Sequence, residues 1–152
     1  MPSNNFHATC VVLPKFNNAG LLIAGPSRSG KSSLALQLLD RGALLISDDQ
    51  TLIQPGAEGL IATAPAGLRG MIEVSGYGIL QLPEDKIADS TWLHLSITLA
   101  APDQPIERLP EDLAQQVLMV PLRRIALHAH DPGAVAKIFA VLSYRLLDYA
   151  HV

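Results

Sequence analysis

The clearest chemical pattern in the chain is Gly25-Pro26-Ser27-Arg28-Ser29-Gly30-Lys31-Ser32, which matches the phosphate-binding pattern G-x-x-x-x-G-K-[ST]. Glycine allows backbone conformations that side chains block, so successive N–H groups of such a loop can point at phosphate oxygens. Lys31 would bring a positive charge to the terminal phosphates, and the Ser32 hydroxyl suits a Mg²⁺ ligand. The pattern therefore predicts a nucleotide or polyphosphate site. The residues expected to contact the nucleotide are Gly25, Pro26, Ser27, Arg28, Ser29, Gly30, Lys31, Ser32 and Ser33.

The segments on either side of this loop have the character that a phosphate site needs. Residues 21–24 are an apolar run typical of a buried strand, and residues 31–40 have the pattern of a helix whose N-terminus would face the anion. Residues 43–47 form a further apolar strand. We expect the two strands to be a parallel pair joined by a right-handed crossover. A glycine-rich turn without a ligand is the weaker alternative.

Two acidic residues, Asp48 and Asp49, directly follow the strand at 43–47. A phosphate-loop enzyme needs acidic groups there, for Mg²⁺ or for the attacking hydroxyl. Adjacent residues of an extended segment point to opposite faces, so we expect one carboxylate to face the nucleotide and the other to be structural. The alternative is a solvated turn that contains both.

Further polar residues are weaker candidates on spacing alone. Glu73 would share a strand face with Ser75 near two glycines, and a surface glutamate beside a hairpin is an equal alternative. His7 is isolated and fits an ordinary strand histidine. His128 and His130 would lie on one face of a strand, but no third metal ligand is near them in the sequence.

Composition restricts the class of protein. The 152 residues suit one domain, 1–152. Apolar residues make up 49% of the chain and charged residues 16%, a composition that argues against disorder. A net charge of −3 argues against a nucleic-acid binder or a protein of anionic membranes. The single Cys10 rules out an internal disulfide framework and fits a buried structural thiol. No signal peptide or membrane-length apolar run is evident, so we expect a soluble cytoplasmic protein.

The remaining elements are expected to extend a parallel core with mixed or antiparallel strands. A first strand is expected at 6–13, and 102–111 is expected to be a surface loop. Asp131-Pro132 predicts the start of a final helix, whose apolar positions run from Val135 to Tyr149 and which packs on the sheet or binds a partner. The other strands are predicted at 51–54, 60–64, 70–74, 77–82, 93–100, 117–120 and 124–127.

Taken together, these segments resemble the catalytic domain of HPr kinase/phosphorylase, in particular the short alphaproteobacterial form that lacks the N-terminal domain. The resemblance covers residues 7–80, about half of the chain. Its parts are His7, the loop 25–32, Leu34-Ala-Leu-Gln-Leu-Leu-Asp-Arg-Gly42, Ile46-Ser-Asp-Asp-Gln50 and Gly70-Met-Ile-Glu-Val-Ser-Gly-Tyr-Gly78. The combination is far more specific than the phosphate loop alone.

The resemblance implies an α/β fold of the P-loop-containing, HPr kinase-like (PEP carboxykinase-like) type, with a mixed central sheet and flanking helices. It implies a protein-serine kinase that uses ATP and Mg²⁺ to phosphorylate HPr, the small phosphocarrier of the sugar phosphotransferase system, and that can reverse the reaction by phosphorolysis with release of pyrophosphate. Family members form homohexamers, and their C-terminal helix helps to receive HPr.

The resemblance also assigns roles to single residues. Asp48 corresponds to the acid/base that takes the serine proton, Asp49 to its neighbouring support, and His7 to a partner of this acidic site. Lys31 belongs to the catalytic set. Ser32 and Glu73 correspond to Mg²⁺-linked groups.

One position departs from the family pattern. The family signature has arginine after Glu-Val, whereas this chain has Ser75, and Arg69 is the nearby residue that would compensate. Ser75 motivates the alternative of a catalytically impaired nucleotide-binding regulatory module. A phosphate-loop kinase of a small metabolite is the other alternative, because the loop does not specify the acceptor.

Overall fold

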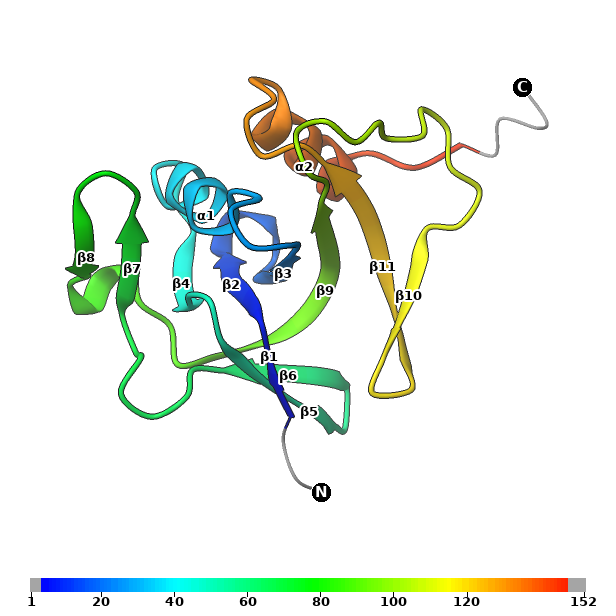
Figure 1. Cartoon of the computed structure of the whole chain (residues 1–152). Coiled ribbons are helices and arrows are strands. Elements are labelled where there is room, and N and C mark those ends of the chain that lie inside the picture. Colours follow the sequence, from blue (N-terminus) through cyan, green and yellow to red (C-terminus); the bar gives the residue numbers. More distant parts are fainter. Residues whose placement is uncertain (1–3, 148–152) are drawn as a thin grey trace.

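One long strand, β9 (Ser90–Leu99), organises the sheet of the computed structural model, which describes residues 4–147. Its first residues pair antiparallel with β6 (Gly59–Thr63). Its later residues pair in parallel with β3 (Ala19–Ala24) on one side and with β11 (Val120–Leu127) on the other. The strand therefore belongs to two parts of the sheet, which curls at this point (Figure 1).

The other strands extend the sheet from these neighbours. Beyond β3 lie β2 (Ala8–Leu13) and β4 (Leu44–Ser47), and beyond β6 lie β5 (Thr51–Gly56) and β1 (Asn4–Phe6). Two hairpins complete the β structure. In one, β10 (Ala114–Val117) pairs with β11. In the other, β7 (Met71–Val74) pairs with β8 (Gly78–Gln81) and forms a separate two-stranded sheet. Short 3₁₀ helices occupy Pro14–Phe16 and Glu84–Lys86.

Two hydrophobic clusters cover the two faces of the curled sheet. On β2, every residue is buried, and alternate side chains enter different clusters. Val11 and Leu13 pack in the cluster that includes helices α1 (Lys31–Leu39) and α2 (Ala134–Ser143), whereas Cys10 and Val12 pack in the cluster that the curl encloses. This alternation follows from the period of two along a strand.

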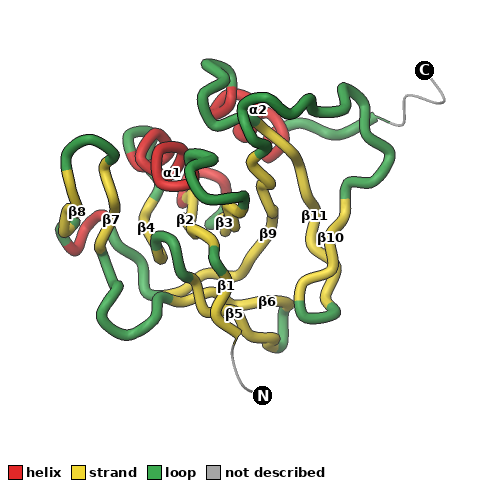
Figure 2. Tube along the Cα trace, in the orientation of Figure 1, coloured by secondary structure: helices red, strands yellow, loops and turns green. Residues whose placement is uncertain are grey.

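The middle of the chain is poor in α-helix, as the sequence predicts: between α1 and α2 it forms strands, loops and the short 3₁₀ helix at Glu84–Lys86, which is also red in Figure 2. The strands expected from 51 to 100 are confirmed as β5 to β9, with ends shifted by a few residues. The strand expected at 6–13 is interrupted at His7, which separates β1 from β2. The strand expected at 117–120 is wrong, because Leu118 and Met119 have positive φ and form the turn between β10 and β11.

The pairing expected around the phosphate loop is also wrong in one respect. The strands before and after α1, β3 and β4, are not neighbours, because β2 lies between them and is antiparallel to both. The short connection from β2 to β3 explains this arrangement, since sequential antiparallel strands pair through short turns.

The final helix begins later and ends earlier than the sequence predicts. Asp131 is not the N-cap residue, but its Oδ1 accepts a hydrogen bond from the N–H of Gly133, which precedes the helix. Phe139 of α2 packs on Phe16 of the first 3₁₀ helix, with ring centroids 4.8 Å apart. Ile138 of α2 belongs to the same hydrophobic cluster as Leu127 of β11, so the helix packs against the sheet. Leu146 lies beyond the helix and is exposed, and Tyr149 is outside the described residues. Between residues 4 and 147, no helix is long and apolar enough to cross a membrane.

Candidate phosphate-binding and acid–base site

The loop between β3 and α1 is tightly enclosed by its neighbours. A Cβ atom at Gly25 would lie 2.6 Å from the Ser29 Oγ and 2.8 Å from the carbonyl oxygen of Leu99. A Cβ atom at Gly30 would lie 2.6 Å from the Cβ of Ala129, and the φ of Gly30 is +96°. Both positions therefore require glycine. At Gly25 the neighbouring atoms leave no room for a Cβ, and at Gly30 the left-handed backbone conformation is a second reason.

Two polar side chains of this loop region are buried. Lys31 is 7% exposed, and its Nζ donates hydrogen bonds to the carbonyl oxygens of Gly25 (3.0 Å) and Pro26 (3.2 Å). The Ser29 Oγ is buried and has no hydrogen-bond partner within the part of the chain that the structure describes. A buried hydroxyl without a partner is unfavourable, and an anion oxygen would satisfy it. The glycines, the Ser29 hydroxyl and the Lys31 ammonium fit a polyphosphate.

Asp48 joins three elements at the end of β4. It is 8% exposed, and its Oδ1 and Oδ2 lie 2.8 and 2.9 Å from the Oγ of Ser32, the second residue of α1. The Oδ1 also accepts a hydrogen bond from the Thr9 Oγ1 (2.8 Å), and the Oδ2 accepts one from the backbone N–H of Glu73 (3.0 Å). The carboxylate thus connects α1 with β2 and β7.

Asp49 has a different side-chain partner, and its φ of +68° places its backbone in the left-handed region. Its Oδ1 lies 2.7 Å from the Nε2 of His7, and the two side chains are 63% and 57% exposed. A carboxylate only accepts hydrogen bonds, so the His7 Nε2 is the donor. The two carboxylates diverge, as strand alternation predicts, and the buried position of Asp48 rules out a solvated turn that contains both.

Thr9 is the residue that the sequence reasoning missed. Its fully buried hydroxyl donates to Asp48 and accepts a hydrogen bond from the backbone N–H of Asp49 (3.1 Å). One side chain therefore holds both acidic residues in place. The available signal was a threonine in an otherwise apolar strand, two residues after His7.

Glu73 contributes its backbone to this cluster, while its side chain is exposed. Ser75 lies in the turn after β7, so it does not share a strand face with Glu73 as the sequence predicted. In residues 4–147 no three or more His, Cys, Asp or Glu side chains gather as metal ligands. The Ser32 hydroxyl and the Asp48 carboxylate are oxygen donors of the type that Mg²⁺ prefers, and they already lie together.

Arg69, the residue expected to compensate for Ser75, is held elsewhere. Its guanidinium donates two hydrogen bonds to Glu84, each 2.8 Å long, and one to Asp89 of 2.7 Å. The hydrogen bonds from Arg69, followed by its positive charge, lower the pKa of Glu84. Arg69 is therefore an anchor for the segment before β9.

The remaining sequence candidates lie outside the cluster around Asp48. Cys10 is fully buried, and burial raises the pKa of its thiol, as expected for a structural cysteine. His128 and His130 follow β11 in a loop, so the strand face predicted for them is wrong, although their ring centroids are 5.7 Å apart.

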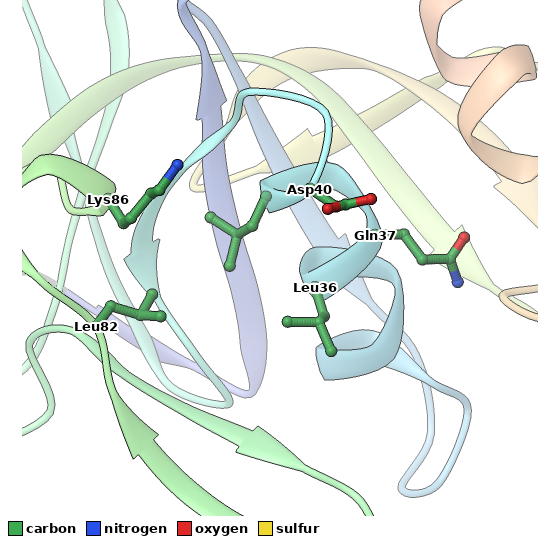
Figure 3. A pocket seen from close by; sticks show the side chains of 6 residues that line it. Leu36, Gln37, Asp40, Leu82 and Lys86 are labelled. Carbon is green, nitrogen blue, oxygen red and sulfur yellow. The ribbon is translucent and has the colours of Figure 1, made fainter.

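A hollow of about 530 Å³ lies along α1, lined by none of the predicted site residues (Figure 3). It is bounded by Leu36, Gln37, Leu39, Asp40, Leu82 and Lys86. The chemistry-bearing residues gather instead around the N-terminus of α1, where Lys31 and Ser32 lie.

Comparison with known proteins identifies the family of the chain. The family model described as "HPr Serine kinase C-terminal domain" matches residues 2–147. An HPr kinase/phosphorylase of Clostridium tetani is 33% identical over 153 residues, which cover 95% of this chain and 49% of the relative. An HPr kinase/phosphorylase of Bordetella pertussis is 36% identical over 116 residues, which cover 71% of this chain and 38% of the relative.

A solved structure has the same arrangement of elements. The Hpr(Ser) kinase/phosphatase of Coxiella burnetii matches with a TM-score of 0.75 and 28% identity, over 91% of this chain and 87% of that chain. The chain spans half or less of the length of the two curated relatives above. The described residues of this chain have a mixed α/β fold with a curled sheet and two α-helices, and this is thus also the fold of the Coxiella burnetii structure. The chain belongs to the HPr serine kinase C-terminal domain family.

Proposed function

We propose that the chain, as one domain over residues 1–152, is the catalytic domain of a protein kinase that uses ATP and Mg²⁺ to phosphorylate a serine of HPr, with or without the phosphorolytic reversal that the family resemblance implies. The family membership and the names of the relatives support the acceptor and the reaction. The observation that supports the chemistry most directly is the hydrogen bond between Ser32 and Asp48, which joins the phosphate loop to a carboxylate.

The loop would hold the phosphates. The nucleotide contacts are proposed for residues 25–33, with the backbone N–H groups and the Ser29 hydroxyl as donors and Lys31 as the positive charge. When bound, ATP with Mg²⁺ would supply the transferable phosphoryl group and neutralise the charge on it. Ser32, Asp48 and, through its exposed side chain, Glu73 are the proposed oxygen ligands of the metal.

The two aspartates have different access to a protein substrate. Asp48 already accepts hydrogen bonds on both oxygens and is buried, whereas Asp49 is exposed and paired with His7. A general base must come within hydrogen-bond reach of the hydroxyl that it deprotonates. The proposed proton acceptor is therefore Asp49, with His7 as its partner, and Asp48 orients Ser32. The sequence resemblance had assigned the proton to Asp48.

A single transfer assay tests the proposal. The protein is incubated with ATP labelled at the γ-phosphate, Mg²⁺ and HPr, and the label is located by mass spectrometry. Label on an HPr serine supports the proposal. ATP binding without transfer would identify the regulatory module instead, and ATP consumption that depends on a metabolite would identify a small-molecule kinase.

The remaining family properties are part of the same proposal. They are a cytoplasmic location, a homohexamer and a contact between HPr and the C-terminal region. Exposed apolar side chains after α2, those of Tyr144, Leu146 and Leu147, are available for such a contact. Sedimentation of the protein alone and with HPr measures both the oligomer and the complex.

A further inference from the structure

The carboxyl ends of three parallel strands meet beside the phosphate loop. β3 leads into Gly25, β9 ends at Leu99 and β11 ends at Leu127. The N–H of Ala100 donates to the Leu127 carbonyl oxygen (2.9 Å), and the Leu99 carbonyl oxygen lies against Gly25. In Figure 1 the arrowheads of β9 and β11 point to the side of the molecule where α2 and the loops after both strands lie. Ligands of α/β sheets bind outside the carboxyl ends of such strands.

The loop after β11 touches the phosphate loop itself. Its first residues are His128, Ala129 and His130, and the Ala129 Cβ lies 2.6 Å from the place that a Gly30 Cβ would take. The contact at Ala129 thus places the backbone that bears both imidazoles next to the end of the phosphate loop. This pair of histidines has no part in the proposed transfer chemistry.

The two imidazoles differ in hydrogen bonding and in exposure to solvent. The Nε2 of His128 donates to the carbonyl oxygen of Gln104 (2.7 Å), in the loop after β9, and this ring is half-buried. His130 is exposed, and the two rings are tilted by 41° with centroids 5.7 Å apart. His128 therefore supports the ring of His130 on one side. An exposed and supported aromatic ring is a surface on which a nucleobase can stack.

The order of strands gives the direction in which a nucleotide extends. Asp48 follows β4, which lies on one side of β3, whereas β9 and β11 lie on the other side. If Ser32 and Asp48 mark the reacting end of the phosphates, the nucleoside extends away from them, towards the loops after β9 and β11. We propose that His130, supported by His128, stacks on the base of the bound nucleotide. This inference rests on the proposed nucleotide site.

Calorimetric titrations with ADP and with inorganic pyrophosphate, both in the presence of Mg²⁺, separate the base from the phosphates. His130→Ala should weaken ADP binding by about 5- to 150-fold, the usual range for the loss of one stacking contact, and leave pyrophosphate binding unchanged. His130→Phe should retain ADP binding, because phenylalanine keeps an aromatic face. ADP, but not pyrophosphate, should shift the NMR signals of the His130 ring.

Met119→Ala is the control, since Met119 is 92% exposed in the turn that precedes β11. Equal weakening of ADP and pyrophosphate in His130→Ala would show a phosphate contact and overturn the stacking proposal. Unchanged ADP binding in His130→Ala, or a loss of ADP binding in His130→Phe as large as in His130→Ala, would overturn it as well. If the unaltered protein binds neither compound, the nucleotide site itself is wrong, which distinguishes that failure from a failure of His130 alone.

Discussion

The hydroxyl of Ser32 lies 2.8 and 2.9 Å from the two carboxylate oxygens of Asp48, sixteen residues later in the chain. This contact connects the first turn of α1 with the end of β4, although β2 separates β4 from β3, the strand that leads into the loop. An oxygen pair of this kind, beside a lysine and the amide groups of a helix N-terminus, is suited to Mg²⁺ and phosphate. The roles of the two neighbouring aspartates follow from it.

The first prediction separates Asp48 from Asp49. Asp49→Asn should retain ADP affinity and lose at least about 100-fold in phosphoryl transfer, as expected for the loss of a general base. Asp48→Asn should lose transfer and also the Mg²⁺-dependent part of ADP binding. Calorimetry with and without Mg²⁺, beside the transfer assay, measures both effects.

Asp40→Asn is the matched control, because Asp40 is an exposed carboxylate at the other end of α1, beside the hollow of Figure 3. It should change neither transfer nor binding. Asp48 would be the general base instead if Asp48→Asn lost transfer but kept normal ADP binding while Asp49→Asn remained active.

The second prediction concerns Thr9, which joins both aspartates. Thr9→Val keeps the shape of the side chain but removes the hydrogen bonds to Asp48 and from Asp49. A hydrogen bond to a charged group contributes about 1.5–3 kcal/mol, so the free energy of unfolding in urea should fall by about that amount. The kcat of phosphoryl transfer should also fall in Thr9→Val, whereas Thr9→Ser keeps the hydroxyl and should have a normal kcat.

Thr51→Val provides the comparison, since the buried Thr51 hydroxyl donates to the neutral carbonyl oxygen of Ala8. The free energy of unfolding should fall by a smaller amount in Thr51→Val, about 0.5–1.5 kcal/mol, and the rate of phosphoryl transfer should not change. Equal effects of the two substitutions on transfer would remove Thr9 from the positioning of the aspartates.

The third prediction tests the enclosure of the loop. Gly30→Ala forces a side chain into a left-handed backbone position and against Ala129, so pyrophosphate affinity should fall at least about tenfold. Gly67→Ala is the control: Gly67 also has a positive φ, +87°, but nothing lies within 4 Å of its added Cβ. Titration calorimetry that finds normal affinity in Gly30→Ala would contradict the tight contact between the two loops.

The fourth prediction is a dependence of stability on pH at the start of α2. The hydrogen bond from Lys137 (2.6 Å), and then that from the Gly133 N–H (2.8 Å), lower the pKa of Asp131. A carboxylate with a lowered pKa in the folded state stabilises that state above its unfolded pKa, and this contribution is lost as the pH falls through the folded value.

The substitution Asp131→Asn tests this, because it removes the charge and keeps an oxygen for the Gly133 N–H. Its thermal midpoint should lie below that of the unaltered protein at pH 7, and the gap should narrow as the pH falls below the unfolded pKa of an aspartate, about 3.9. A gap that stays constant over this range would show that the charge of Asp131 is without effect.

Local patterns in the sequence predicted much of this structure. The start of α1 at Lys31 and the strands from β5 to β9 follow from glycine spacing and apolar periodicity, which act over a few residues. The insertion of β2 between β3 and β4 was missed because strand pairing is non-local. Thr9 was missed for the same reason, since only the pairing of Cys10 with Ser47 brings β2 beside the end of β4.

The divergence of the aspartates has a different origin from the predicted one. Alternation along a strand predicted opposite faces, but β4 ends at Ser47, and the left-handed conformation of Asp49 produces the divergence. The use of the Glu73 backbone N–H, rather than its side chain, depends on the position of the β7–β8 hairpin, which no local pattern specifies.

Transfer of the γ-phosphate of ATP to HPr, compared between the unaltered protein and Lys31→Ala, is the most direct test of the proposed kinase. The unaltered protein should place label on an HPr serine in the presence of Mg²⁺. Lys31→Ala should fold normally by circular dichroism and lose both pyrophosphate binding and at least about 100-fold of the transfer rate. Undiminished transfer by Lys31→Ala would contradict a kinase site at this loop, and no label on HPr with the unaltered protein would contradict HPr as the acceptor.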